Sequence, residues 1–478
     1  MLLVENFISN YLGKIFVALA HFIFVPFYIH YLGFSNFGLI AIYTVLLTVS
    51  GIFNSGLSAA FNRVAAQGND FESLTFLKTS ERLVASILIL IAVFLASFPE
   101  FITTLWADNE VNSSVVVQLM LALVVPQIMF GLYLAGLYGL QRHVTANTVN
   151  GILILIRNGM VIPVLIISPD IEVFFVWQLV VTVTFAIIIR KTLMNSFSKE
   201  LKNDSSFDWS VLRKHRKYII GLFYLTIIST INSQLDKMIL ISFVDLSVLG
   251  VYTSIHMLAM LTYSVCVPIC ITLFPAITNA LLAGNEEKRK FLINAMFTLI
   301  VFVSVSVFML LICNYREIMN LWIPILEMTP TNSFVAVMLL FGGQFLALQL
   351  FPYYLMLSNN MSLEVSKITL YTLLFMLPVI FYLVREFGVI GASIAWLSSN
   401  VLNFILLVYL GLFKSGILND CTFLKDIKHA VTVVLIALLI EFSAMRFELG
   451  ILIYLLLICV LGLYIFRPAF EALRDNRH

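Results

Sequence analysis

Charged residues are scarce in this sequence. They make up 11% of its 478 residues, while hydrophobic residues make up 61%. An ordinary soluble domain carries about 25% charged residues, so this chain lacks the polar side chains that a soluble surface needs. Its mean hydropathy of +1.01 supports the same exclusion. We therefore expect a membrane protein, and the net charge of +2 gives no sign of a nucleic-acid partner.

Catalytic and metal-binding motifs are also missing. The sequence has no Gly-rich loop ending in Gly-Lys-Ser or Gly-Lys-Thr, no His-Glu-x-x-His and no Gly-x-Ser-x-Gly. The outside loop near residues 314–331 has only two carboxylates, Glu317 and Glu327, which gives little support to a membrane-embedded glycosyltransferase. Cys266 and Cys270 lie one helical turn apart without a nearby His or acidic residue, so packing is favoured over metal binding. We expect no enzyme activity, no cofactor and no metal.

Long apolar stretches are what the sequence does have. A span of about 20 residues crosses a hydrocarbon core about 30 Å thick, and a helix satisfies its own backbone groups where water is absent. The sequence therefore predicts an all-α polytopic membrane protein with about 14 transmembrane helices. The predicted spans begin near residues 9, 37, 83, 114, 147, 172, 218, 249, 292, 332, 363, 389, 429 and 450.

The distribution of Lys and Arg predicts the orientation of these spans. If both termini are cytoplasmic, three of the 28 basic residues fall within spans, three fall in outside loops (Arg316, Arg385 and Arg446), and the remaining 22 lie on the inside. This asymmetry follows the positive-inside rule. Glu5 precedes the first apolar stretch and Lys14 lies inside it, so we expect no cleavable signal peptide.

An internal repeat divides the chain. Several short matches recur at offsets of about 212 to 219 residues, which indicates duplication. They pair Ser35–Gly38 with Ser247–Gly250, Gly68-Asn69 with Gly284-Asn285, Gln127 with Gln344, and Trp177 with Trp396. We predict a six-helix bundle at 1–190, a basic cytoplasmic linker at 191–217, a second six-helix bundle at 218–412, and two extra helices with a cytoplasmic tail at 413–478. Such parallel repeats place substrate between the halves near the midplane of the membrane.

Polar residues inside spans are the candidate site. A charge at mid-bilayer costs at least about 2.5–3.5 kcal/mol, so each one needs a reason. Asn10, Lys14, His21 and Tyr28 share one face of the first span at 100° per residue. Other spans contribute further polar residues: Arg157, Asp236, Lys237, His256, Asn400 and Asn403. Three Lys or Arg against one Asp give a cationic balance, which predicts an anionic substrate.

Structural explanations for these residues stay open. In one alternative, Asp236 and Lys237 neutralise each other without contacting substrate. In another, Asp236 pairs with Lys14 or Arg157 and holds helices together. Lys14 could instead extend its side chain to the lipid headgroups. His21 and His256 could instead be hydrogen-bonded histidines of the protein interior. The stripes of Asn and Ser residues could instead form hydrogen bonds between helices and hold them together.

Short motifs resemble those of Wzx-type polysaccharide flippases, which belong to the multidrug, oligosaccharidyl-lipid and polysaccharide exporter superfamily. The resemblance extends over essentially the whole chain. It lies in Tyr31–Gly38, Gly56-Leu57, Asn62–Ala65, Gln234–Leu240 and Leu249–Tyr252.

The resemblance implies a flippase of the bacterial inner membrane. Its substrate would be an undecaprenyl diphosphate-linked oligosaccharide destined for O-antigen lipopolysaccharide, capsule or a related glycan, and its partners would include membrane lipid and a glycan polymerase with chain-length proteins. We expect alternating access through a cationic cleft lined by Lys14, His21, Arg157, Lys237, Asn10 and Asn400. Proton or sodium coupling stays open, with Asp236, His256 and Glu364 as candidates for coupling or for a structural ion pair.

Three other functions remain. A lipid II flippase differs in substrate but hardly in physics. A multidrug or cation antiporter of the same superfamily is disfavoured by the basic balance, because organic cations need an acidic cleft. A membrane scaffold without transport would use the buried charges only for structure, and would tolerate replacement of Lys14 and Arg157.

Overall fold

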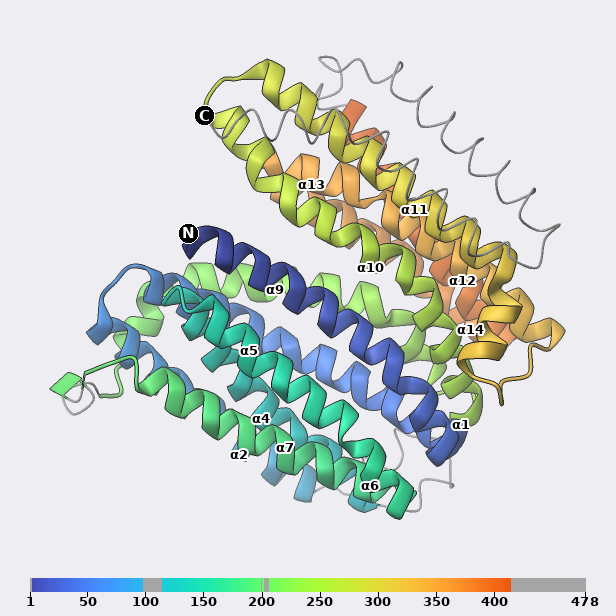
Figure 1. The fold of residues 1–478 in the computed structure, drawn as a ribbon, viewed down its shortest axis with the longest axis horizontal. Coiled ribbons are helices and arrows are strands. Elements are labelled where there is room, and N and C mark those ends of the chain that lie inside the picture. Colours follow the sequence, from blue (N-terminus) through green and yellow to red (C-terminus); the bar gives the residue numbers. More distant parts are fainter. Residues whose placement is uncertain (1, 98–113, 199, 202–205, 414–478) are drawn as a thin grey trace. The chain divides into compact units, whose positions relative to one another are not determined.

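The computed structural model describes residues 2–97, 114–198, 200–201 and 206–413, and all its regular elements there are helical (Figure 1). The side chains of residues 2–21, 53, 87–97, 114, 225 and 411–413 are outside this description. The helices are α1 (Leu2–Ala66), α2 (Asp70–Ser97), α4 (Ser114–Gly139), α5 (His143–Ile154), α6 (Val161–Ile167), α7 (Ile171–Met194), α9 (Trp209–Leu240), α10 (Leu246–Leu282), α11 (Glu286–Trp322), α12 (Pro330–Leu348), α13 (Leu350–Ser358) and α14 (Ser362–Leu406), with π-helical turns η1 (Leu155–Gly159) and η2 (Leu407–Phe413).

Two of these helices each contain two predicted spans. The backbone of α1 leaves the helical conformation at Gly33, where φ is +78°, and that of α14 does so at Gly388, where φ is +54°. Glycine tolerates this region because it has no Cβ. Figure 1 shows α1 as two arms that run in opposite directions. The first twelve predicted spans thus have helical counterparts, while the last two lie outside the described residues.

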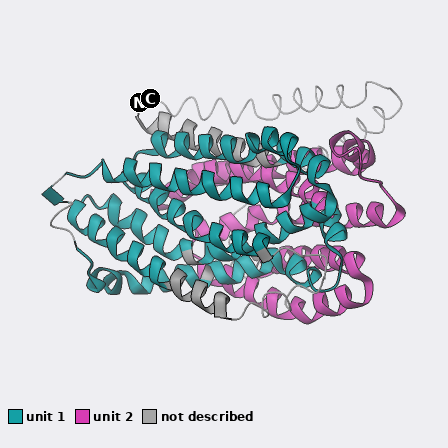
Figure 2. Ribbon diagram, turned by 90° about the horizontal axis from the view of Figure 1, so that it is seen from below, with its two compact units in different colours: residues 1–253 teal, residues 254–478 magenta. Residues whose placement is uncertain are grey.

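The chain divides into two compact units, Met1–Thr253 and Ser254–His478 (Figure 2). The apolar core of the first unit includes Phe61 and Phe76, whose rings stack with their centroids 5.8 Å apart. The core of the second includes the buried thiols Cys266 and Cys270. The division falls inside α10, because α9 packs on α1 and α2 of the first unit. The predicted division into six-helix halves joined by a linker stays a prediction.

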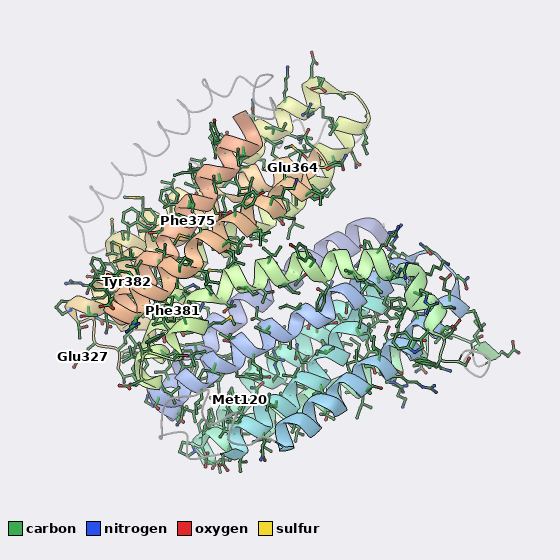
Figure 3. All side chains as sticks on the ribbon, turned by 180° about the vertical axis from the view of Figure 1, so that it is seen from behind. Met120, Glu327, Glu364, Phe375, Phe381 and Tyr382 are labelled. Carbon is green, nitrogen blue, oxygen red and sulfur yellow. The ribbon has the colours of Figure 1, made fainter. Side chains whose placement is uncertain are left out.

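The outer surface of the helices is apolar. Large hydrophobic side chains on α14 are strongly exposed, with 63% of Phe375 and 61% of Tyr382 accessible, and Figure 3 shows them on the outside of that helix. Within the described residues, nine helical segments are long and apolar enough to cross a membrane. A soluble protein would not tolerate this much exposed apolar surface. The expected all-α, multi-pass membrane fold is therefore confirmed.

Two repeat-related glycines meet where α1 crosses α10. A Cβ added to Gly38 would clash with the carbonyl oxygen of Leu246, and one added to Gly250 would clash with the carbonyl oxygen of Phe34. Small residues at helix crossings let two backbones approach closely. Both glycines come from the matched segments of the sequence repeat, so the duplicated motif has a packing role.

Candidate functional site

A π-helical turn interrupts the fifth predicted span. In η1 the N–H of Met160 donates to the carbonyl of Leu155, five residues earlier, at 3.2 Å. Pro163 follows shortly afterwards and has no N–H for the carbonyl of Gly159, four residues before it, so regular α-helical bonding cannot continue through this region. Isolated π turns of this kind frequently occur at functional sites.

Side chains from two other helices bind the carbonyl oxygens of this turn. On α7, Trp177 Nε1 donates to the carbonyl of Ile156 at 3.2 Å, and Gln178 Nε2 donates to that of Arg157 at 3.1 Å. On α1, the hydroxyl of Tyr28 donates to the carbonyl of Asn158 at 2.7 Å. Three consecutive carbonyls are thus satisfied from α1 and α7, which holds η1 in a defined position.

Arg157 is the cation that this turn presents. Its Nη1 donates to Gln127 Oε1 on α4 at 2.9 Å, so its partner is a neutral amide. Among the described residues it forms no ion pair. Three buried donors in this region have no hydrogen-bond partner there: Arg157 Nε, Asn158 Nδ2 and the Tyr43 hydroxyl. Arg157 also lies close enough to Tyr28 and Tyr43 to interact with them electrostatically.

This cluster can bind an anion. A buried donor without a partner is costly, and water or an anionic ligand relieves that cost. A guanidinium with free N–H groups suits phosphate oxygens especially well, because its planar fork matches their geometry. We call Arg157, Gln127, Asn158 and Tyr43 the η1 cluster.

Asp236 and Lys237 lie in the last turns of α9, where both are buried. Lys237 Nζ is 4.0 Å from Asp236 Oδ2, and the hydroxyl of Tyr252 on α10 donates to the same oxygen at 2.7 Å. Only 1% of Asp236 and 6% of Lys237 are exposed. These contacts favour the alternative in which the two charges neutralise each other and join α9 to α10.

A second polar cluster lies within the second unit. The ring of His256 on α10 meets that of Trp396 on α14 edge to face, with centroids 4.7 Å apart. Asn400 Nδ2 donates to the carbonyl of Trp396 at 2.9 Å, and Gln349 Nε2 donates to Asn400 Oδ1 at 3.3 Å. Gln349 sits at the break between α12 and α13, which Pro352 explains because it has no N–H for the carbonyl of Leu348.

For the remaining predicted site residues the structure gives only the helix and, for Glu364, the exposure of the side chain. Asn10, Lys14 and His21 belong to the first arm of α1, and their side chains lie outside the described part of the structure. Glu364 is exposed in the first turn of α14, at one end of that helix (Figure 3). A carboxylate there is favoured by the helix dipole.

Sequence reasoning overlooked most of the hydrogen-bonding partners. Gln127, Gln178, Tyr252 and Gln349 were not among the candidate site residues, although each binds one that was. A signal existed for Gln127, and also for Trp177, which donates to the carbonyl of Ile156. Gln127 and Trp177 both matched across the repeat, which marked them as positions where the two halves keep the same polar or aromatic side chain.

The fold and its apolar outer surface define a multi-pass helical membrane protein. A family model described as polysaccharide biosynthesis protein matches residues 3–281. This match covers more than half of the sequence. The chain therefore belongs to the polysaccharide biosynthesis protein family, as the sequence resemblance predicted.

Solved structures share the fold at low sequence identity. The lipid II flippase MurJ in an inward closed conformation has a TM-score of 0.76 at 14% identity, over 98% of this chain and 100% of that chain. An inward-facing multidrug resistance MATE family transporter of the MOP superfamily gives 0.68 at 13%, over 86% and 96%. A MOP superfamily transporter from Pyrococcus furiosus, described as having a binding pocket of reverse polarity, gives 0.59 at 13%, over 90% and 96%. No curated protein sequence matches significantly.

Proposed function

We propose that this protein flips an undecaprenyl diphosphate-linked oligosaccharide across the bacterial inner membrane, from the cytoplasmic to the outer leaflet. The exported unit would enter O-antigen, capsule or a related polysaccharide. Both termini would be cytoplasmic, as the distribution of Lys and Arg predicts. The family supports a role in polysaccharide biosynthesis, and the shared fold supports alternating access by two halves.

The η1 cluster carries this proposal. Arg157 is a cation inside a membrane span, and its hydrogen-bond partner among the described residues is the neutral Gln127. An unneutralised cation is costly in the bilayer unless water or an anion shares its site. A diphosphate supplies the anion, and the unsatisfied donors of Arg157, Asn158 and Tyr43 supply the hydrogen bonds.

The predicted stripe on the first span would extend this site. Tyr28 belongs to that stripe, and its hydroxyl binds the carbonyl next to Arg157. The same stripe includes Asn10, Lys14 and His21. In this proposal these residues and Arg157 provide the cationic lining.

The polar cluster of the second unit would contact sugar. Trp396 and Asn400 are both buried here, so in this proposal the ring and the amide meet sugar rings and hydroxyl groups only when the helices move during alternating access. Asp236 with Lys237 would act as a structural ion pair, and His256 is the retained candidate for proton coupling. A substrate with uncompensated negative charge is also moved outward by an inside-negative potential, which contributes about 2.3 kcal/mol per charge per 100 mV.

Deleting the gene and analysing the lipids by mass spectrometry tests the function. We expect undecaprenyl diphosphate-linked oligosaccharide to accumulate while surface glycan disappears. Accumulation of lipid II would support the lipid II flippase instead. An unchanged lipid pool with sensitivity to cationic drugs would favour the antiporter.

Complementation with variants then tests the η1 cluster. We expect Arg157→Gln to abolish export and Arg157→Lys to restore it only in part, because Lys keeps the charge but loses the planar fork. Lys191→Gln is a matched control, since it removes an exposed basic residue from the last turn of α7. Normal export by Arg157→Gln, at an equal protein level, would refute the anchoring role.

A further inference from the structure

A cavity in the first unit lies between α1, α2 and the first three turns of α9. Its volume is about 320 Å³, near the lower end of the range of about 300–1,000 Å³ for small-molecule sites. Its apolar wall includes Leu57 of α1, Leu83 of α2 and Ile219 of α9, while Arg213 and Arg216 contribute its basic side. The cavity therefore has an apolar interior and a cationic edge.

The two arginines of this cavity have no ion-pair partner among the described residues. Both are exposed on α9. Their neighbour Lys214, in contrast, is paired with Glu72 on α2 at 2.6 Å. A nearby basic residue, Arg63, lies over the ring of Tyr218 at 5.1 Å and adds to the positive charge of this region. Charge complementarity calls for an anion.

The position of the cavity suits a membrane interface. Trp209 lines it at the start of α9 and is 52% exposed, and tryptophan is enriched where a membrane meets water. The sequence turns from basic to apolar within two turns of α9, since Ile219 and Ile220 follow Arg213, Arg216 and Lys217. The charged headgroup of an amphiphile would therefore lie beside the arginines, and its apolar chain would lie beside the isoleucines.

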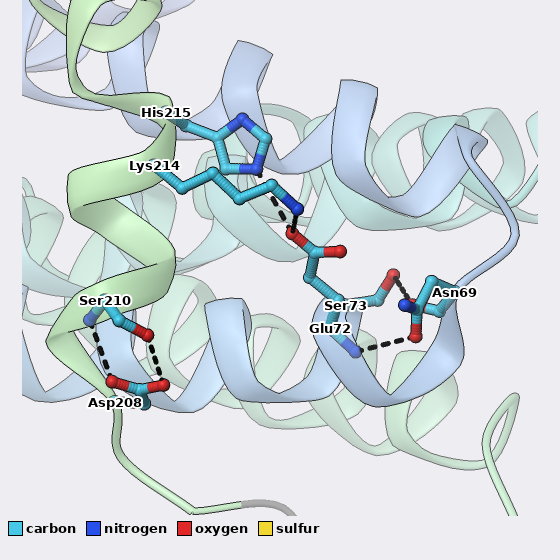
Figure 4. Close-up of polar contacts among 7 residues, drawn as sticks. All are labelled: Asn69, Glu72, Ser73, Asp208, Ser210, Lys214 and His215. Atoms are coloured by element: carbon cyan, nitrogen blue, oxygen red, sulfur yellow. Dashed lines mark hydrogen bonds and ion pairs between the residues drawn. The ribbon is translucent and has the colours of Figure 1, made fainter.

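The surroundings of the cavity are firmly held. At one side, the N–H of Asp208 donates to Thr79 Oγ1 at 3.0 Å, and Lys214 and His215 both contact Glu72 (Figure 4). At the other, α9 packs closely on α1, where a Cβ added to Gly56 would lie 2.8 Å from the carbonyl oxygen of Ile219. The cavity is thus a space between fixed helices.

We infer that this cavity binds an anionic phospholipid of the surrounding bilayer. Its phosphate contacts Arg213 and Arg216, and part of one acyl chain occupies the space between Leu57, Leu83 and Ile219. The orientation proposed above puts this lipid in the cytoplasmic leaflet. Because the lipid contacts α9 together with α1 and α2, it stabilises the packing of these helices. This lipid site is separate from the η1 cluster.

Purified full-length protein in nanodiscs tests the inference. Nanodiscs of phosphatidylcholine alone are compared with nanodiscs containing phosphatidylglycerol, and the melting temperature and the lipids retained in native mass spectrometry are measured. We expect phosphatidylglycerol to raise the melting temperature of the wild type. The variant Arg213→Gln with Arg216→Gln should lose at least half of that increase and retain at least threefold less phosphatidylglycerol.

Two further variants complete the test. Lys288→Gln with Lys290→Gln removes the same charge from exposed positions at the start of α11 and should behave as the wild type. Ile220→Trp keeps both arginines but adds bulk at an exposed residue lining the cavity, so it should also reduce lipid retention.

Four outcomes would overturn the inference. The first is an arginine variant that matches the wild type, and the second is an equal effect of phosphatidylcholine. The third is displacement of the lipid by millimolar inorganic phosphate, which would indicate a soluble anion. The fourth is displacement by a polyprenyl diphosphate at lower concentration, which would assign the cavity to substrate. All four outcomes are measured on purified protein. A failure of this inference can therefore be distinguished from a failure of the proposed function, which is measured as glycan export in cells.

Discussion

Gly38 and Gly250 pack against each other's helices in a reciprocal way: each glycine faces the backbone of the residue four positions before the other glycine. The Cβ position of Gly38 points at the carbonyl of Leu246, and that of Gly250 points at the carbonyl of Phe34. The contact is reciprocal, and the two glycines occupy equivalent places in the sequence repeat. This is the arrangement that a duplicated segment adopts when its two copies pack across a local two-fold axis.

Replacement of either glycine should destabilise this crossing. Gly38→Ala or Gly250→Ala forces a methyl group against a backbone carbonyl that only a shift of the whole helix can move, and overpacking of this kind costs about 1–3 kcal/mol. We expect a lower melting temperature for the purified protein. Gly51→Ala is the control on the same helix, because its Cβ would meet nothing within 4 Å. Equal melting temperatures for Gly38→Ala and Gly51→Ala would contradict the close contact.

The carbonyls of η1 give a second prediction. Trp177→Phe keeps an aromatic ring but removes the N–H that donates to Ile156. The lost hydrogen bond should cost about 0.5–1.5 kcal/mol, and export should fall as well, since the η1 turn positions Arg157. Thermal melting and complementation measure the two effects. Val176→Ala, at an exposed position on the same helix, should change neither. Full export with a lowered melting temperature would show that η1 does not need Trp177 to position Arg157.

The sequence predicted the helices well because the membrane dictates their length. Apolar stretches marked the first twelve spans, and Gly33 and Gly388 fall at the turns expected between spans. The π turn at Leu155–Gly159 was not predicted. Its bonding depends on Tyr28, Trp177 and Gln178, which are remote in sequence, and no local pattern of residues reports such contacts.

The candidate site was predicted in composition but not in geometry. Counting charges within spans found Arg157 and Lys237, yet the count treated them alike. The structure separates them, because Lys237 lies beside Asp236 whereas Arg157 contacts the amide of Gln127. The partner of a buried charge is fixed by tertiary packing, so Tyr252, on another helix, was beyond reach of the sequence pattern.

The contact between α2 and α9 should depend on pH. Hydrogen bonding by Lys214 holds the pKa of the Glu72 carboxyl below its usual range. A carboxylate with a lowered pKa in the folded state stabilises the protein above its unfolded pKa, about 4.3, and loses this contribution as the pH falls through the folded value. His215 also faces this carboxylate.

The variant Glu72→Gln isolates this effect. We expect it to melt at a lower temperature than the wild type at pH 7, and the difference should shrink as the pH falls below about 4.3. Glu327→Gln, at an exposed position between α11 and α12 (Figure 3), should match the wild type throughout. A difference that does not change with pH would show that the Glu72 contact is not ionic.

A double-mutant cycle should establish the role of Lys237. Removing one partner of a buried ion pair leaves an uncompensated charge and costs about 3–5 kcal/mol, whereas removing both charges costs much less. Lys237→Met alone should therefore lower the melting temperature more than Lys237→Met combined with Asp236→Asn. If the pair is structural, the double variant should also export glycan at near the wild-type level. If Lys237 binds the diphosphate, the double variant should fold well and yet fail to export, because restoring neutrality would not replace a cation that substrate needs.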